Sequence, residues 1–401
     1  MFERQGSKGY KPGLQTTEVL DAHYGHPHRQ FQTIHVAGTN GKGSVSHALA
    51  RILQDAGLRV GLYTSPHLVD FRERIRVNGE YISKEYVVDF VADYLLWRQE
   101  TETSPSEGRL EGAPSFFELT TALAFRYFAD QKVDVAVIEV GLGGRLDSTN
   151  IITPVLSVIT NISLDHTQFL GSTLAEIAAE KAGIIKRGVP VVIGETTPET
   201  RPVFEQKARE MNAPIVFAEE FEMPTPLPDF ELKGAYQEKN LRTILCAVAQ
   251  INSTLNIQHS TLNIQNLGLL GRWQTLKTRP LVVCDTGHNT AAWQYLVPQI
   301  QAQPCRQLRL VFGMVDDKDI DTVLSMLPKN AIFYFTQAST HRAIPAEVVA
   351  EKAAAHNLRG ATFPTVSEAY QQALADASPN DFIFVGGSSY LVADLLSSET
   401  A

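Results

Sequence analysis

The glycine-rich stretch Gly38-Thr39-Asn40-Gly41-Lys42-Gly43-Ser44 holds the residues with the clearest chemical potential. Its glycines let backbone N–H groups surround a phosphate, and a helix that starts there adds partial positive charge. Lys42 can reach the terminal phosphates of a nucleotide, and the Ser44 hydroxyl can bind Mg²⁺. The usual phosphate loop has four residues between its first glycine and the Gly-Lys pair, whereas only two residues separate Gly38 from Gly41-Lys42. The stretch therefore predicts a phosphate-binding loop, with an ordinary structural turn as the alternative.

Two further candidate positions follow predicted buried strands. Glu139 follows the mostly apolar run at residues 133–138, and His166 comes six residues after the run at 155–160. The carboxyl ends of parallel strands meet at the edge of the sheet where α/β folds bind ligands. We expect Glu139 and His166 to lie at the same edge as Ser44. For His166 the alternative is a purely structural role.

The elements around these residues alternate between strand and helix patterns. A predicted strand at 31–36 precedes the glycine-rich stretch, and apolar residues at helical spacing follow it at 45–53. Further strands are predicted at 59–64, 189–193 and 215–217, and in the last part of the chain at 281–284, 308–312, 332–335 and 382–385. Helices are predicted after Ser83, after Ser115 and Thr173, which each have Glu three residues later as in a capping box, and at 237–251.

The predicted fold is therefore α/β: a P-loop nucleotide-binding domain with a parallel sheet, plus a smaller C-terminal α/β domain that is Rossmann-like. A length of 401 residues favours two domains, and we place them at residues 1–270 and 271–401. Residues 65–76 are charged and contain Pro66, which predicts a loop near the phosphate site or a solvated turn. Residues 100–113 are a predicted exposed loop, and a polar stretch at 252–266 follows the predicted helix at 237–251.

Composition limits the possible partners and the compartment. A net charge of −9 argues against nucleic-acid and membrane-surface binding, so positive charge for a polyphosphate must be concentrated locally. Three scattered cysteines without a Cys-x-x-Cys pair predict reduced thiols. Residues 1–13 lack the apolar run of a signal peptide, and no run approaches the ~20 apolar residues of a membrane span. We expect a cytoplasmic protein.

These motifs together resemble the folylpolyglutamate synthase/dihydrofolate synthase family, within the muramyl ligase superfamily. The resemblance covers nearly the whole chain. It rests on the motifs at 36–44, 64–68, 73–75, 139–147, 164–167, 180–186, 271–272 and 285–289. The superfamily uses Gly-Thr-x-Gly-Lys-x-Ser/Thr, which accounts for the short spacing after Gly38. Thr286-Gly287 stands where the family commonly has Gly-Ala, a change that keeps the polar partners Asp285 and His288.

The resemblance implies an ATP-dependent ligase that adds L-glutamate to dihydropteroate or to folates. The substrate carboxylate attacks the γ-phosphate to give an acyl phosphate and ADP, and the amine of L-glutamate then displaces phosphate. Charge neutralisation matters more in such chemistry than a side-chain nucleophile. The expected ligands are ATP, L-glutamate, dihydropteroate or folates, and two Mg²⁺ ions. The expected protein is a monomer with no nucleic-acid or membrane partner.

The resemblance also implies roles for particular residues. Lys42 would hold the β- and γ-phosphates, Ser44 and Glu139 one Mg²⁺, and His166 a second Mg²⁺. Lys181 matches a family lysine that becomes carbamylated; the alternative is an ordinary cation at a helix C-terminus. The resemblance also implies that Arg272, Asp285 and His288 contact the nucleotide and glutamate, with His288 among the catalytic residues. Asn240 would contact the nucleotide on the adenine side. The folate would be bound by Phe71, Arg72 and Arg74.

Two other functions remain as alternatives. A muramyl-peptide ligase would use the same mechanism on a nucleotide-sugar substrate, but residues 64–76 resemble the folate branch. A nucleotide-binding regulator without ligase activity would not need to keep Lys42, Ser44, Glu139, His166 and Lys181 together. The sequence leaves open whether the enzyme makes dihydrofolate, extends polyglutamate chains, or does both.

Overall fold

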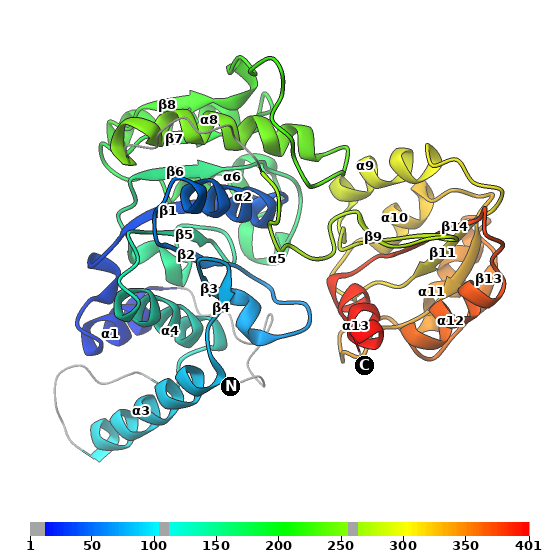
Figure 1. The fold of residues 1–401 in the computed structure, drawn as a ribbon, viewed down its shortest axis with the longest axis horizontal. Coiled ribbons are helices and arrows are strands. Elements are labelled where there is room, and N and C mark those ends of the chain that lie inside the picture. Colours follow the sequence, from blue (N-terminus) through cyan, green and yellow to red (C-terminus); the bar gives the residue numbers. More distant parts are fainter. Residues whose placement is uncertain (1–12, 104–111, 256–263, 401) are drawn as a thin grey trace. The chain divides into compact units, whose positions relative to one another are not determined.

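The chain forms two compact units, each built from one mixed sheet and its helices (Figure 1). The computed structural model describes residues 13–103, 112–255 and 264–400. Unit 1 comprises Met1–His67, Phe71–Glu231 and Lys239–Gly268, and unit 2 comprises Leu68–Asp70, Leu232–Glu238 and Leu269–Ala401. The long segment of unit 2 begins beside the boundary proposed near residue 270. Unit 2 also takes two short segments from the first part of the chain, which were not predicted from the sequence.

Unit 1 contains a largely parallel sheet. Among the described residues its strands are β1 (Gln32–Ala37), β2 (Val60–Tyr63), β3 (Ile75–Val77), β4 (Glu80–Tyr81), β5 (Val135–Glu139), β6 (Leu156–Ile159), β7 (Val191–Ile193) and β8 (Ile215–Phe217). Their order is β4-β3-β2-β5-β1-β6-β7-β8, and only β3 and β4 run antiparallel to their neighbours. The strands β5 and β6 are buried along their whole length, as expected for parallel strands with both faces covered.

The register of this sheet brings the ends of three strands together. β1 lies between β5 and β6 and pairs with both in parallel, so Val36 is opposite Glu139 and Ala37 is opposite Ile159. The segments that begin at Gly38, Val140 and Thr160 therefore leave the sheet at one edge. This is the edge at which α/β proteins bind ligands.

Two helices of unit 1 begin at capping boxes that the sequence supplies. The helices of this unit are α1 (Gln15–His23), α2 (Lys42–Asp55), α3 (Lys84–Thr103), α4 (Phe116–Asp130), α5 (Thr167–Leu170), α6 (Leu174–Ala182), α7 (Arg201–Met211) and α8 (Gln237–Leu255). Both predicted capping boxes are present, Ser115 with Glu118 at α4 and Thr173 with Glu176 at α6. In each box the side chains satisfy backbone N–H groups that the first helical turn leaves unpaired.

Unit 2 has its own parallel-dominated sheet. Among the described residues its strands are β9 (Gln274–Thr278), β10 (Leu281–Asp285), β11 (Leu308–Phe312), β12 (Ile332–Phe335), β13 (Gly360–Thr362) and β14 (Phe382–Gly386). Their order is β13-β12-β11-β14-β10-β9, and β9 is antiparallel. The helices are α9 (Thr290–Gln301), α10 (Ile320–Met326), α11 (Ala346–Ala355), α12 (Val366–Ala375) and α13 (Ser389–Thr400). The α/β prediction is confirmed.

The prediction of a continuous loop at residues 65–76 is wrong. Residues Phe71–Arg74 form a 3-10 helix and β3 follows directly. The charged residues Glu73, Arg74 and Arg76 are buried. Burial is possible because the charges have partners: the Arg76 guanidinium lies 4.7 Å from the Tyr81 ring centroid and donates to the Gly268 carbonyl at 3.1 Å.

Two predicted segments begin later than expected, the loop at 100–113 and the polar stretch at 252–266. α3 continues to Thr103, and α8 continues to Leu255. Residues 104–111 and 256–263 of these segments lie outside the described residues, as do residues 1–12.

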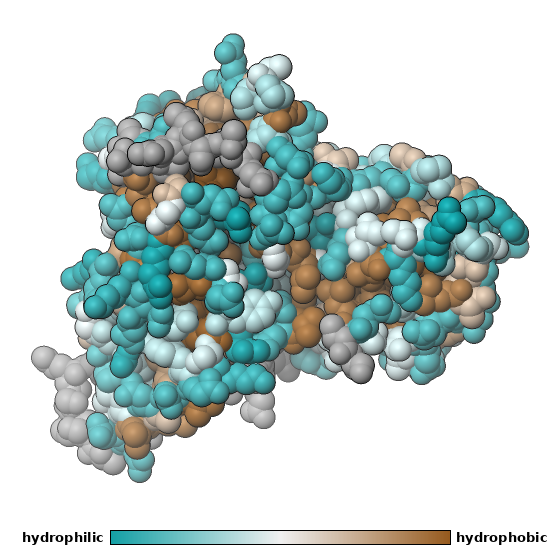
Figure 2. Space-filling view, viewed as in Figure 1, coloured by the Kyte–Doolittle hydropathy of each residue, from teal (hydrophilic) through white to brown (hydrophobic). Residues whose placement is uncertain are grey.

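The exposed surface mixes hydrophilic and hydrophobic side chains (Figure 2). Val88, Leu95 and Leu96 of α3 are among the large hydrophobic residues that are exposed. Within the part of the chain that the structure describes, no helix has both the length and the apolar character needed to cross a membrane.

Candidate active site

The glycine-rich stretch forms a tight turn between β1 and α2. Gly38 and Gly41 adopt φ values of 147° and 83°, which side chains other than glycine rarely tolerate. The Lys42 ammonium folds back over the turn and donates to the carbonyls of Gly38 and Thr39, each at 3.1 Å. Ser44 lies in the first turn of α2 and is 1% exposed. The strand, turn and helix have the arrangement of a phosphate-binding loop.

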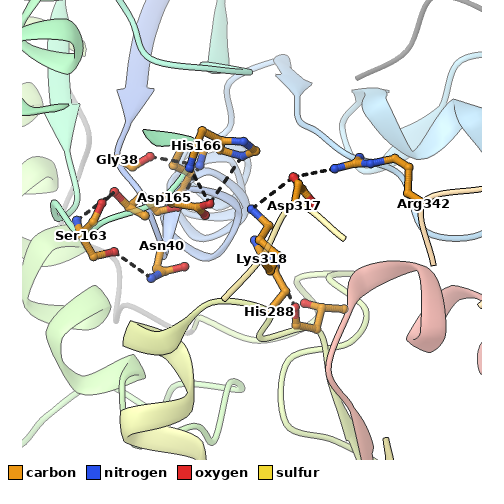
Figure 3. Close-up of polar contacts among 12 residues, drawn as sticks. Gly38, Asn40, Ser163, Asp165, His166, His288, Asp317, Lys318 and Arg342 are labelled. Atoms are coloured by element: carbon orange, nitrogen blue, oxygen red, sulfur yellow. Dashed lines mark hydrogen bonds and ion pairs between the residues drawn. The ribbon is translucent and has the colours of Figure 1, made fainter. Parts of the chain in front are cut away.

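A second segment, Thr160 to Ser163 after β6, fixes the shape of this turn. Ser163 N donates to Thr39 Oγ1 at 3.0 Å, and Asn40 N donates to Asn161 Oδ1 at 2.9 Å. The Thr160 hydroxyl donates to the Asn40 carbonyl at 2.6 Å. Figure 3 shows Asn40 pointing toward Ser163. The sequence analysis missed these supporting residues, although polar residues directly after a buried strand at the same edge were a usable signal.

Replacing Gly38 by alanine is expected to destabilise unit 1. The new Cβ would lie 1.8 Å from Thr160 Oγ1, and the backbone would keep a positive φ. Gly57→Ala is a matched control, because Gly57 has φ 88° but nothing within 4 Å of the added Cβ. We expect Gly38→Ala to lower the free energy of unfolding by about 1–3 kcal/mol more than Gly57→Ala, the usual cost of overpacking. Equal losses in calorimetric unfolding would contradict the close contact with Thr160.

Glu139 and Ser44 provide the donor types that suit Mg²⁺. Glu139 ends β5, is 3% exposed, and accepts a hydrogen bond from Ser65 N at 3.4 Å. Mg²⁺ is usually bound through one or two carboxylates, phosphate oxygens and water, so a nucleotide completes such a site. Accordingly, the described residues contain no group of three or more His, Cys, Asp or Glu side chains arranged for a metal ion. A buried carboxylate and a hydroxyl fit a metal that arrives with phosphates.

His166 lies in the loop between β6 and α5, at a left-handed backbone position with φ 50°. Its backbone N–H donates to Asp165 Oδ1 at 2.8 Å, and its ring Nε2 lies 3.9 Å from the same oxygen (Figure 3). The His166 side chain is 37% exposed, whereas that of Asp165 is 8% exposed. Asp165 therefore holds the backbone at His166 while the imidazole keeps access to solvent.

Lys181 is buried in the last turn of α6, at 4% exposure. Burial, followed by the positive charge of Lys42, lowers the pKa of Lys181 from 10.5 to about 7, and Asp165 and Asp147 act in the opposite direction. A large fraction of the Lys181 amine is therefore neutral near pH 7. An ordinary helix-terminal cation would lie in solvent with its charge intact, whereas the Lys181 side chain is buried.

The loop after Glu139 is organised by Asp147, which is 5% exposed. Its carboxylate accepts hydrogen bonds from the backbone N–H groups of Gly141, Leu142 and Thr149 at 2.8–3.0 Å, and from the Thr149 hydroxyl at 2.6 Å. Burial raises the pKa of Asp147, and these hydrogen bonds oppose the increase. The carboxylate thus fixes the backbone that follows the proposed metal ligand.

The residues expected on the folate side form an aromatic and cationic cluster. The Phe71 ring packs edge-on against Phe116, with centroids 5.8 Å apart. The Arg74 guanidinium lies 5.1 Å from the Phe116 centroid, and its Nε donates to His67 Nδ1 at 2.7 Å. Arg74 is buried and Arg72 is only partly buried, so Arg72 is the better placed of the two for a ligand carboxylate.

Asn240, in the first turn of α8, lies against the phosphate-binding turn. A Cβ added to Gly41 would come within 2.3 Å of Asn240 Oδ1. The structure therefore places Asn240 beside the loop backbone itself.

In unit 2 the Asp285 carboxylate is turned inward and is 2% exposed. It accepts hydrogen bonds from the Tyr236 hydroxyl at 2.8 Å, Trp273 N at 2.7 Å and Gly287 N at 2.8 Å. Burial raises the pKa of Asp285, and the positive charge of Arg272 opposes this. Asp285 is therefore better suited to holding the backbone around Arg272 than to contacting a ligand directly. Sequence reasoning did not detect Tyr236, because no local motif marks it.

His288 follows Asp285 at the end of β10, and its ring Nδ1 lies 3.1 Å from the Thr286 carbonyl oxygen. Arg272 donates to the Gly271 carbonyl at 3.1 Å. Both side chains are partly buried, so each keeps some exposed surface for a ligand.

Two family models match most of the chain between residues 106 and 389. Residues 106–266 match the family model of the Mur ligase middle domain, and residues 271–389 match that of the Mur ligase glutamate ligase domain. The chain is thus an ATP-dependent ligase of the Mur ligase class. It is 33% identical to the Bacillus subtilis protein named dihydrofolate synthase/folylpolyglutamate synthase, over 96% of this chain and 95% of the relative. The chain belongs to the folylpolyglutamate synthase/dihydrofolate synthase family.

A longer relative and two solved structures extend the comparison. The Haloferax volcanii protein named probable bifunctional folylpolyglutamate synthase/dihydropteroate synthase is 34% identical over 96% of this chain, which spans 48% of that relative's length. The Escherichia coli structure described as FolC in complex with DHPP and ADP has a TM-score of 0.86 and 31% identity, and the match covers 98% of this chain and 95% of that one. A Yersinia pestis structure described as complexed with AMPPNP and Mn ion has a TM-score of 0.85 and 31% identity, covering 100% and 96%.

Proposed function

We propose that this chain joins L-glutamate to dihydropteroate and to folates, using ATP. The observation that carries the proposal is the phosphate-binding turn with Lys42 and Ser44, beside the strand end that presents Glu139. The Escherichia coli structure described as a complex with DHPP and ADP supports an adenine nucleotide as a ligand beside the second substrate.

The proposed reaction has two balanced steps. A carboxylate oxygen of the acid attacks the γ-phosphorus, the bond to the bridging oxygen breaks, and ADP leaves with that electron pair. The amine nitrogen of L-glutamate then attacks the acyl carbon, phosphate leaves, and the amine loses a proton. The protein contributes mainly positioning and charge stabilisation to such a phosphoryl transfer.

ATP with a divalent metal fits the residues at the strand edge. The Yersinia pestis relative bound to AMPPNP and Mn supports this pairing. Lys42 would leave the carbonyls of Gly38 and Thr39 and turn to the β- and γ-phosphates. Ser44 and Glu139 would hold Mg²⁺, which supplies further positive charge to the phosphates. In this proposal His166 binds a second Mg²⁺.

Lys181 takes part as a carbamate in this proposal. Its neutral amine nitrogen attacks the carbon of CO₂, an N–C bond forms, one C–O π pair moves to oxygen, and the nitrogen releases a proton to water. A cation becomes an anion at a position that faces the charge of Lys42. The buried amine with a pKa of about 7 supports this step, because only the neutral form reacts.

The remaining roles follow from side-chain chemistry. Phe71 and Arg72 bind the pterin-bearing acid, with Arg74 holding the cluster together. Asn240 supports the nucleotide from beside Gly41. Arg272 and His288 serve the nucleotide and glutamate, and Asp285 holds the segment that carries them.

The test measures ADP release with each member of a panel of substrates. We expect L-glutamate-dependent ADP release with dihydropteroate and with tetrahydrofolate, and none with a muramyl-peptide precursor. Release with the muramyl substrate alone would replace the proposed function by the muramyl alternative. ATP binding without ADP release on any substrate would indicate the non-catalytic regulator.

A further inference from the structure

Asn150 joins two segments of unit 1 that are far apart in sequence. It lies in the short 3-10 helix Ser148–Ile151 and is 7% exposed. Its side-chain Nδ2 donates to the Arg145 carbonyl at 3.0 Å and to the Gly183 carbonyl at 3.1 Å. Only the NH₂ side of the amide can face two carbonyl oxygens, so the orientation of the amide is fixed.

The two joined segments carry the proposed metal ligand and the proposed carbamate. The segment containing Arg145 follows Glu139, and Gly183 comes two residues after Lys181. Arg145 N also donates to the Glu180 carbonyl at 2.8 Å. The loop backbone thus binds directly to the last turn of α6.

The packing between these segments leaves no room for side chains at two glycines. A Cβ added to Gly183 would lie 2.4 Å from Arg145 Cα, and one added to Gly144 would lie 2.9 Å from the Glu180 carbonyl oxygen. With backbones this close, Asn150 connects them through both of its N–H groups. The Arg145 guanidinium adds a more exposed ion pair with the Glu180 carboxylate at 2.8 Å. Losing Asn150 leaves two partly buried carbonyls without that donor, which favours local separation of the segments.

We propose that Asn150 is a positioning residue that holds the end of α6 against the loop after Glu139, so that the Lys181 amine stays in the buried place where it takes up CO₂. The inference rests on the proposed role of Lys181, and it adds a residue that makes no contact with substrate. This role explains why an amide is useful at position 150. Both partner groups are carbonyl oxygens, which need N–H donors, and an ionised carboxylate has no donor.

The experiment traps the carbamate directly. The full chain is equilibrated with ¹³C-labelled bicarbonate, alkylated with a trialkyloxonium salt, digested, and analysed by mass spectrometry for the labelled group on Lys181. Asn150→Asp keeps the side-chain shape but removes the NH₂ donors, and Asn150→Ala removes the whole amide. We expect about fivefold to tenfold less trapped carbamate in both variants. The KM for ATP should stay near the wild-type value and kcat should fall.

Ser157→Ala is the matched control. The Ser157 hydroxyl is buried and donates to the Ile184 carbonyl at 2.9 Å, so this variant also removes a buried hydrogen bond to the segment after α6 without releasing the loop. It should lose stability, measured by thermal unfolding, but keep the carbamate. Equal amounts of trapped carbamate in the wild type and in both folded Asn150 variants would overturn the inference about Asn150 but not the proposed role of Lys181. A loss of trapped carbamate in Ser157→Ala as large as that in the Asn150 variants would do the same. No carbamate on wild-type Lys181 would overturn the inference together with the proposed role of Lys181.

Discussion

Replacing Lys42 by alanine is expected to lower turnover about 100-fold to 1,000-fold while the protein stays folded. The Lys42 ammonium is held over the phosphate-binding turn by the carbonyls of Gly38 and Thr39. Removing one preorganised charge contact to the transition state commonly costs this factor in kcat. The side chain is only partly buried, so its loss leaves no large core cavity. The measurement is ADP release at saturating substrates, with thermal unfolding as the check on folding.

Lys84→Ala provides the control for this substitution. Lys84 is also the first residue of a helix, α3, but it is exposed and lies outside the proposed site. Its replacement should leave kcat within about twofold, because exposed substitutions of this kind rarely have larger effects. If folded Lys42→Ala turned over as fast as Lys84→Ala, the assignment of the phosphate-binding turn would be wrong.

Replacing Lys181 by alanine is expected to reduce kcat by at least about 100-fold, again the scale for a lost electrostatic group in the transition state. The reason is the loss of the proposed carbamate, because neither alanine nor an unmodified ammonium supplies its negative charge. Acetate or formate should restore part of the activity of Lys181→Ala by filling the vacated position with a carboxylate. The measurement is ADP release with increasing concentrations of the added acid.

Lys181→Arg separates the carbamate from a simple cation. Arginine keeps a positive charge near the end of α6 but remains protonated and does not react with CO₂. We expect this variant to be as inactive as Lys181→Ala and not to respond to acetate, because its side chain still fills the site. Wild-type activity in Lys181→Arg would contradict the carbamate hypothesis and would support the alternative that Lys181 is an ordinary helix-terminal cation.

The sequence alone determined the parts of this protein that depend on short stretches of chain. The glycines before Lys42 predicted a turn between strand and helix, and both glycines with positive φ are found in that turn. Ser115 with Glu118 and Thr173 with Glu176 predicted two helix starts that the structure confirms. Buried parallel strands appeared as short apolar runs, so the α/β class and the strand end at Glu139 were predictable as well.

Only the tertiary structure decided which distant segments meet and which charges become buried. Thr160 to Ser163 hold the phosphate-binding turn, and Asn150 holds the end of α6, through contacts that no local spacing encodes. Arg74 belongs to a charged stretch for which the sequence predicted a loop, yet it is buried, with contacts to His67 and Phe116. The low pKa of Lys181 has the same origin. Local propensity acts within a turn or two of the chain, whereas desolvation and pairing depend on every segment that packs around a side chain.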